Sequence, residues 1–176
     1  MGQVANRAAA QASATGSGQS QDATGPRTDV TYGYTDTPVA AGNHVVVIGT
    51  DPVTGESYAT RGGPALGRGE GGCCTIFAEA GVFDESFRDP PSVVHTRQAV
   101  GAVNISLSDF AARANEFANV TNANELPYLG ITSDSNSYGF TFGASLGLGR
   151  PTPAVWAPGW RFGTPSPGLS YLEGRR

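Results

Sequence analysis

The segment 43–61, NHVVVIGTDPVTGESYATR, decides the fold that we predict for this chain. Its first part, 43–49, is a β-branched run without amphipathic periodicity, which is typical of a buried strand. The Asp-Pro and Thr-Gly pairs within 51–55 supply turn chemistry, and 57–61 is typical of a second short strand. We therefore predict a β-hairpin over this segment.

Outward from the hairpin, the chain predicts two more strands and two helices. The segment 74–79 (CTIFAE) is a candidate strand, and 96–105 has Val and Ala spaced as in a strand. Apolar residues recur at three- and four-residue spacings over 106–121, which predicts an amphipathic helix. A second helix is predicted over 135–148, where glycines and a proline close it. The candidates for the N-cap of the first helix are Ser106 and Ser108.

These elements predict an α+β domain in which two main helices pack on a small, mainly antiparallel sheet. The chain ahead of Tyr32 has no aromatic residue and is rich in Ala, Gln, Ser, Gly and Thr. Such a segment cannot bury enough apolar surface to offset its ordering entropy. We therefore predict a flexible linker or tail over 1–38, a compact domain over 39–163 and a frayed tail over 164–176.

Composition and charge exclude several classes of protein. No run of about 18 apolar residues occurs, so the sequence predicts no membrane span. The formal net charge is −4, without the clustered cations that nucleic-acid binding requires. The amino terminus has no apolar stretch of the kind that a secretory signal carries. We therefore expect neither nucleic acid nor a membrane span among the features of this chain.

The sequence predicts no metal site and no cofactor. The histidines are His44 and His95, and Cys73 and Cys74 are adjacent, so no zinc-ligand spacing occurs. No glycine-rich stretch has the spacing of a phosphate loop. The two cysteines form either a vicinal disulfide or two small thiols, and the sequence leaves both states open.

Two polar positions are candidates for chemistry. His44 opens an apolar strand, where it is either a general base in a cleft or a satisfied histidine at a strand end. Ser135 begins the second predicted helix, where free backbone N–H groups and the helix dipole favour a nucleophile and an oxyanion hole. The Ser, Asp and Asn residues around it are also ordinary helix-capping residues. Both interpretations stay open for each position.

Together these residues resemble the circularly permuted papain-like fold, which includes the NlpC/P60-like and LRAT-like amidases and acyltransferases. The usual motif is Asn-Cys with an aromatic or apolar residue three positions on, and Asp134-Ser135 with Tyr138 matches that spacing. The order of His44 before Ser135 also matches the permuted arrangement. The resemblance extends over about 39–160. Stretches similar to carboxy-terminal effector modules of bacterial polymorphic and Rhs-type toxins are RGGP (61–64), NSY (136–138) and WAPGW (156–160).

The resemblance implies an effector-type hydrolase or acyltransferase that attacks an amide or ester bond. Ser135 stands where most of the superfamily has cysteine and would be the nucleophile, with His44 as its base. Thr60, Arg61 and Glu79 are candidates for the third residue, which orients the histidine, and Glu79 is the better electrostatic partner for an imidazolium. The implied partners are an amide- or ester-containing substrate and a cognate immunity or carrier protein. The implied location is secreted, or delivered without a Sec signal of its own, and otherwise cytoplasmic. The candidate substrate-binding residues are Arg61, Asn136 and Trp156.

Two other functions stay open. One is a non-catalytic interaction or structural module of the same fold, associated with a secretion system or a phage particle. The other is a lectin-like adhesion domain, with Trp156 and Trp160 as a carbohydrate platform. A hydrogen bond between His44 and Ser135 in a pocket favours the hydrolase, whereas a buried and filled Ser135 favours the interaction module.

Overall fold

The computed structural model describes residues 25–36, 42–65, 75–128, 134–149 and 151–159. Within them five strands precede two α-helices, and a short 3-10 helix, η1 (Pro91–Val93), lies between the last two strands. The strands are β1 (Thr28–Asp36), β2 (Asn43–Thr50), β3 (Ser57–Pro64), β4 (Ile76–Val82) and β5 (Thr96–Val103). The helices are α1 (Leu107–Ala123) and α2 (Ser135–Ser145).

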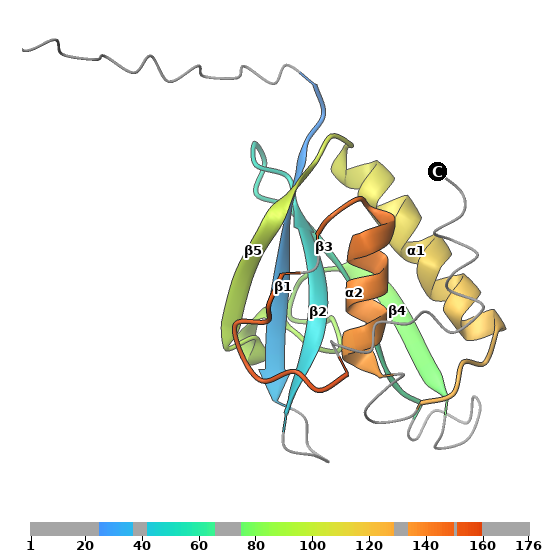
Figure 1. The fold of residues 1–176 in the computed structure, drawn as a ribbon. Helices are drawn as coiled ribbons and strands as arrows, with labels where there is room; N and C mark the ends of the chain where they lie inside the picture. The colour runs from blue at the N-terminus through green and yellow to red at the C-terminus, as the bar shows by residue number, and fades with distance from the viewer. Residues whose placement is uncertain (1–24, 37–41, 66–74, 129–133, 150, 160–176) are drawn as a thin grey trace, which may run out of the picture.

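The five strands form one antiparallel sheet in the order β4-β3-β2-β1-β5, and both helices pack on one face of it (Figure 1). We call the helix-covered face the front and the other face the rear. The predicted hairpin is confirmed as β2 and β3, with Thr50 paired to Ser57 beside the turn. The Asp51 carboxylate accepts the N–H groups of Val53 and Thr54 and so fixes that turn. The α+β class predicted from the sequence is confirmed.

The predicted start of the compact domain near residue 39 is wrong, because β1 belongs to the sheet. β1 lies between β2 and β5 and pairs with both. Its residues Val30, Tyr32 and Tyr34 belong to the buried core on the front. This alternation is a strand signal that the polar composition of the preceding chain obscured. Residues 1–24, the cysteine pair at 73–74, Trp160 and the predicted tail over 164–176 lie outside the described residues.

α2 is the central element of the front and is buried on every side along most of its length. The hydroxyl of Tyr138 lies 2.6 Å from Thr60 Oγ1 on β3. Because that threonine hydroxyl already donates to the carbonyl of Glu79, the tyrosine is the donor. A Cβ on Gly139 would lie 2.7 Å from Cγ1 of Val45, so the helix approaches β2 at a distance that requires glycine. Together these contacts fix α2 over β2 and β3.

α1 lies beside α2 on the front, over β3 and β4 (Figure 1). Its N-cap is Ser106, one of the two predicted candidates, whose hydroxyl accepts a backbone N–H of the first turn. Edge-on aromatic pairs join the two helices, with ring centroids 5.6 Å apart for Phe110 and Phe142 and 5.1 Å apart for Phe117 and Tyr138. The two helices therefore share one aromatic core.

α2 ends three residues earlier than the sequence predicts, at Ser145 rather than Leu148. The reason is Gly147, whose φ of +80° ends the helix in the left-handed conformation that glycine adopts without strain. The N–H of Leu148 then donates to the carbonyl of Gly143, which closes the helix end in a Schellman motif. The glycine that the sequence identified as a stop signal is thus the C′ residue.

The rest of both faces is covered by irregular chain. On the front, the segment 151–159 passes over β1 and β5, where the amide of Gln98 donates to the carbonyl of Thr152 and accepts from the N–H of Ala154. On the rear, the β4–β5 connection (83–95) packs its aromatic side chains on the sheet. The buried members of this rear cluster are Val46, Ile48, Ala59, Phe83 and Phe87.

Substituting Gly49 by alanine should destabilise the fold, because the added Cβ would lie 2.7 Å from two ring carbons of the buried Phe110. We expect Gly49→Ala to lower the free energy of unfolding by about 1–3 kcal/mol, the usual cost of overpacking a filled core. The matched control is Gly149→Ala, where no atom lies within 4 Å of the new Cβ. Urea denaturation of both variants checks this, and equal stability of the two would contradict the packing of α1 on β2.

Candidate functional site

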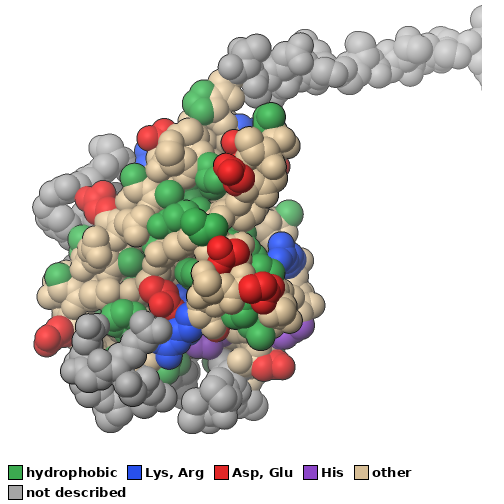
Figure 2. All heavy atoms as spheres, turned by 180° about the vertical axis from the view of Figure 1, so that it is seen from behind, with side chains coloured by type: hydrophobic (Ala, Val, Ile, Leu, Met, Phe, Trp, Pro, Cys, Tyr) green, Lys and Arg blue, Asp and Glu red, His purple; other side chains and the backbone are tan. Residues whose placement is uncertain are grey.

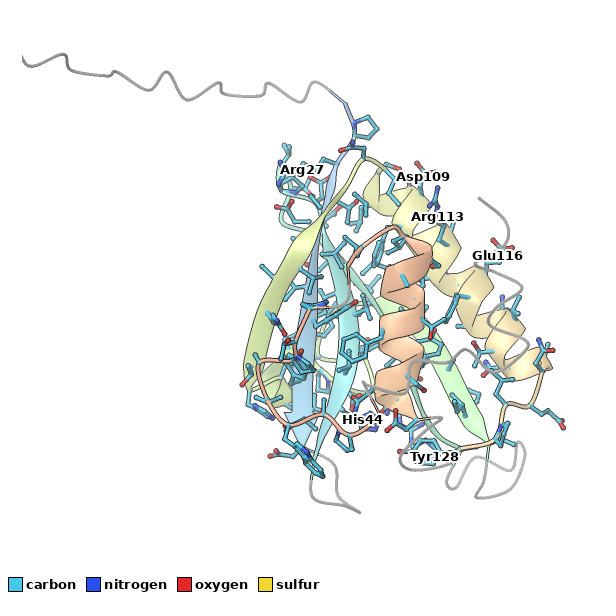
Figure 3. All side chains as sticks on the ribbon, viewed as in Figure 1. Arg27, His44, Asp109, Arg113, Glu116 and Tyr128 are labelled. Carbon is cyan, nitrogen blue, oxygen red and sulfur yellow. The ribbon has the colours of Figure 1, made fainter. Side chains whose placement is uncertain are left out.

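The predicted site residues gather at the end of the sheet where β2 and α2 begin. Figure 3 shows His44 and Tyr128 at this end. β2 and α2 are tied together here because the side-chain amide of Asn136 donates to the carbonyl of Asn43 at 2.9 Å. The predicted site residues near this end are nevertheless divided between the two faces of the sheet.

His44 lies on the rear face, whereas Ser135 lies on the front. Side chains alternate between the two faces along a strand. In β2, Val45 and Val47 belong to the front core with α2, whereas Val46 packs in the rear cluster. His44 shares the face of Val46 and is 6% exposed. The sheet itself therefore separates the imidazole from α2.

Arg61 is the centre of a buried charged cluster on the rear face. It is 4% exposed and is paired in register with Glu79 of β4. Its Nη1 donates to Glu79 Oε1 at 3.2 Å, its Nε lies 2.5 Å from Asp89 Oδ2, and its Nη2 lies 3.3 Å from His44 Nε2. A Cβ on Gly63 would collide with Nη2, so glycine is required there. We call the side chains of His44, Arg61, Glu79 and Asp89 the Arg61 cluster.

The contact with Arg61 fixes the protonation of the His44 ring. A guanidinium has no acceptor, so Nε2 of His44 must accept and the ring proton must be on Nδ1. Nδ1 is buried and has no hydrogen-bond partner within the part of the chain that the structure describes. Burial and the neighbouring guanidinium groups of Arg61 and Arg88 lower the pKa of His44 to about 3. The ring is therefore a neutral acceptor for Arg61.

Ser135 is the first residue of α2 and is 2% exposed. Its hydroxyl is close enough to Tyr128 to lower the pKa of the phenol. Burial and the carboxylate of Asp134 raise the pKa of Tyr128 more strongly, so the net direction is upward. The predicted hydrogen bond between His44 and Ser135 is not formed, since Nε2 of the histidine contacts Arg61 and Nδ1 has no partner among the described residues.

The capping interpretation of this helix start is confirmed. Asp134 is the N-cap of α2, and its Oδ1 accepts the N–H groups of Asn136 and Ser137, each at 2.9 Å. The hydroxyl of Ser137 in turn accepts the N–H of Asp134 at 2.8 Å, which completes a capping box. Burial raises the pKa of Asp134 to about 6, although the backbone hydrogen bonds oppose that shift. The N–H groups of Asn136 and Ser137 are thus used by the cap and are not free to form an oxyanion hole.

The predicted substrate-binding residues have separate roles. Asn136 is buried and donates to the carbonyls of Asn43 and Pro158, so it ties α2 to β2 and to the segment 151–159. Arg61 is engaged on the rear face. Trp156 is 64% exposed, and its carbonyl accepts from the side chain of Asn43. Of these three residues, only the tryptophan presents a side chain to the surface.

The structure therefore brings together His44, Arg61 and Glu79 but not these residues with Ser135. Glu79 neutralises Arg61 instead of orienting the histidine. Sequence reasoning missed Asp89, which pairs with Arg61 from the β4–β5 connection. An arginine inside a predicted strand is a signal that a buried counter-charge exists. With 15 acidic residues in the chain, that signal does not identify which carboxylate supplies it.

The described residues contain no cluster of metal-ligating side chains and no membrane-spanning helix. Within the five described ranges, no three His, Cys, Asp or Glu side chains are placed to hold a metal ion. Neither α-helix in those ranges has the length and apolar character needed to cross a bilayer. The chemistry of this end of the sheet is thus that of the Arg61 cluster on the rear and the α2 cap on the front.

Replacing Asp134 by asparagine should remove one source of pH dependence. The pKa of Asp134 is raised from 3.8 to about 6, so the folded state holds this proton more tightly than the unfolded chain. Its contribution to stability is present below the unfolded value and is lost as the pH rises through about 6. Relative to wild type, Asp134→Asn should gain on the order of 2 kcal/mol between about pH 4.5 and pH 7.5.

Urea denaturation at the two pH values measures this difference. The control is Asp109→Asn, which removes a carboxylate from the first turn of α1. If the difference in unfolding free energy between wild type and Asp134→Asn is the same at both pH values, this carboxyl group is not buried as described.

Comparison with known proteins identifies no relative of this chain. No family model, no curated protein and no solved structure matches this chain. The inference of function therefore rests on the geometry of the two faces.

Proposed function

We propose that this chain is a non-catalytic interaction module rather than a hydrolase. The observation that carries the proposal is the separation of His44 and Ser135 by the sheet. A serine nucleophile needs a base within hydrogen-bond reach, because its hydroxyl is unreactive at its own pKa. Here the one lone pair of the neutral imidazole faces Arg61, and the Nδ1 side of the ring has no partner among the described residues. This arrangement supports a structural role for both residues.

The two edges of the sheet differ in a way that suggests where a partner binds. The β4 edge is capped by Asn122 of α1, whose side-chain amide donates to the carbonyl of Ala78 and accepts its N–H. The carbonyl of Leu126 also accepts the N–H of Ile76. Within the described residues, β5 pairs only with β1, and no side chain or backbone group bonds its outer edge. An uncapped edge is a template for an added strand.

The sequence of β5 favours an extended segment of another protein over a second copy of this chain. A bulge interrupts its register beside Val30 and Thr31, and Arg97 is exposed on the rear. Bulges and edge charges discourage edge-to-edge association of identical sheets. Arg97 also contacts the ring of Phe83, 5.4 Å from its centroid, which holds the guanidinium beside the edge. We propose a partner strand with an acidic residue opposite Arg97, supplied by a carrier protein or by a neighbouring component of a larger particle.

The non-catalytic assignment is tested with a fluorophosphonate probe, which labels activated serine nucleophiles. We expect wild type and Ser135→Ala to react equally weakly, because no base activates the hydroxyl of Ser135. A serine hydrolase run in parallel serves as the positive control. Labelling of the wild-type chain that Ser135→Ala abolishes would overturn the proposal in favour of the hydrolase.

The binding edge is tested with peptides selected from a random-sequence display library on the immobilised chain. We expect bound peptides to slow amide hydrogen exchange in β5. Arg97→Glu should weaken their binding roughly fivefold, the effect of about 1 kcal/mol that an exposed charge pair contributes. The matched control is Arg113→Glu, an exposed arginine on α1. Peptides that bind both variants equally and leave β5 exchange unchanged would place the binding surface elsewhere.

A further inference from the structure

We propose that the Arg61 cluster is an acid-operated latch, which holds the β4–β5 connection on the sheet at neutral pH and releases its Asp89 end in acid. This inference does not depend on the non-catalytic assignment. Three separate segments meet on one buried guanidinium: β2 through His44, β4 through Glu79 and the connection through Asp89. Figure 2 shows charged and histidine side chains gathered on this part of the rear face. Releasing one partner therefore loosens the contacts of the others.

Protonation of His44 breaks this arrangement for a geometric reason. The neutral ring has a single lone pair, on Nε2, and that lone pair accepts from Arg61 Nη2. The second proton must therefore bind where the guanidinium donates. Two N–H groups then face each other, and the imidazolium becomes a cation next to Arg61 and Arg88. The orphaned Nδ1–H gains no acceptor from this change, since none lies beside it among the described residues.

Burial of the imidazole, and after it the charged groups around His44, determine the sign of the pH dependence. Arg61 from β3 and Arg88 from the connection lower its pKa, and Glu79 from β4 and Asp89 from the connection neutralise Arg61. The folded pKa is depressed from 6.5 to about 3, so the latch is fully stable above the unfolded value and weakens as the pH falls toward 3. Burial raises the pKa of Asp89, and this shift favours the closed form in acid. The shift of the pKa of His44 is the larger of the two and acts in the opposite direction.

The opening is local because the other end of the connection is held by apolar contacts. Phe83 and Phe87 pack edge-on with ring centroids 6.1 Å apart, and both lie in the rear cluster with Ile48. The N–H of Phe83 also donates to the carbonyl of Ser57. These contacts do not titrate. Acid therefore frees the chain around Asp89 and the start of β2, while the aromatic end stays on the sheet.

Amide hydrogen exchange at about pH 7 and about pH 4.5, corrected for intrinsic rates, tests the latch in the full chain. The key variant is His44→Gln, whose side-chain oxygen accepts from Arg61 near the Nε2 position but does not titrate. The matched control is His95→Gln at the other histidine, which is partly exposed and contacts Asp36 instead of the Arg61 cluster. In wild type we expect protection around Asp89 and at the start of β2 to fall by up to about tenfold per pH unit below 6.5, relative to α1. His95→Gln should behave as wild type, and His44→Gln should keep its protection.

Either of two results overturns the latch. One is unchanged protection around Asp89 in acid in the wild-type chain, and the other is an equal loss in wild type and His44→Gln. If His44→Gln does not fold, the nitrogen-15 spectrum of the His44 ring in wild type decides instead. A proton on Nδ1 at neutral pH supports the latch, and a proton on Nε2 contradicts it.

Discussion

The burial of one guanidinium, that of Arg61, constrains the whole end of this fold. A charge that is 4% exposed is costly to bury unless opposite charges neutralise it, and here Glu79 and Asp89 do so. This requirement fixes the register of β4 through Glu79, the path of the β4–β5 connection through Asp89 and the absence of a side chain at Gly63. It also determines the state of His44, which is held as a neutral acceptor on the rear face.

The front face is organised by a different requirement, the burial of a helix on all sides. α2 has small or aromatic residues around its whole circumference, and glycines at Gly139 and Gly143 admit Val45 and Tyr32 at close range. Its first turn is satisfied internally by the Asp134 capping box. The polar groups at this helix start cap the helix. The sequence therefore resembles a permuted papain-like motif, but Ser135 and His44 do not form a nucleophile–base pair in this structure. The candidate residues on the two faces thus serve the packing of the fold. Among the described residues the outer edge of β5 is uncapped, and it is there that we propose a partner strand binds.

Local signals in the sequence predicted much of this fold. The hairpin, the first helix with Ser106 at its start and the capping role of the residues before α2 follow from turn chemistry, periodicity and capping preferences. β1 was missed because its alternation of Val30, Tyr32 and Tyr34 follows directly on polar chain. The Arg61 cluster could not be predicted from the sequence, because one partner of the buried charge, Asp89, comes from a loop distant in the chain. The face on which His44 lies could not be predicted either. β2 is apolar on both faces, so the alternation of its side chains does not distinguish front from rear.

The central claim is that the sheet separates His44 from Ser135, and nuclear Overhauser contacts of the His44 ring measure this directly. The account predicts contacts from the ring Cε1 proton to Gly63 and to the Arg61 side chain, since Cε1 lies 3.4 Å from the position of a Cβ on Gly63. It predicts none to the β protons of Ser135. Contacts between the imidazole and Ser135, with none to Gly63, would contradict the account and restore the serine–histidine pair as the functional centre of the chain.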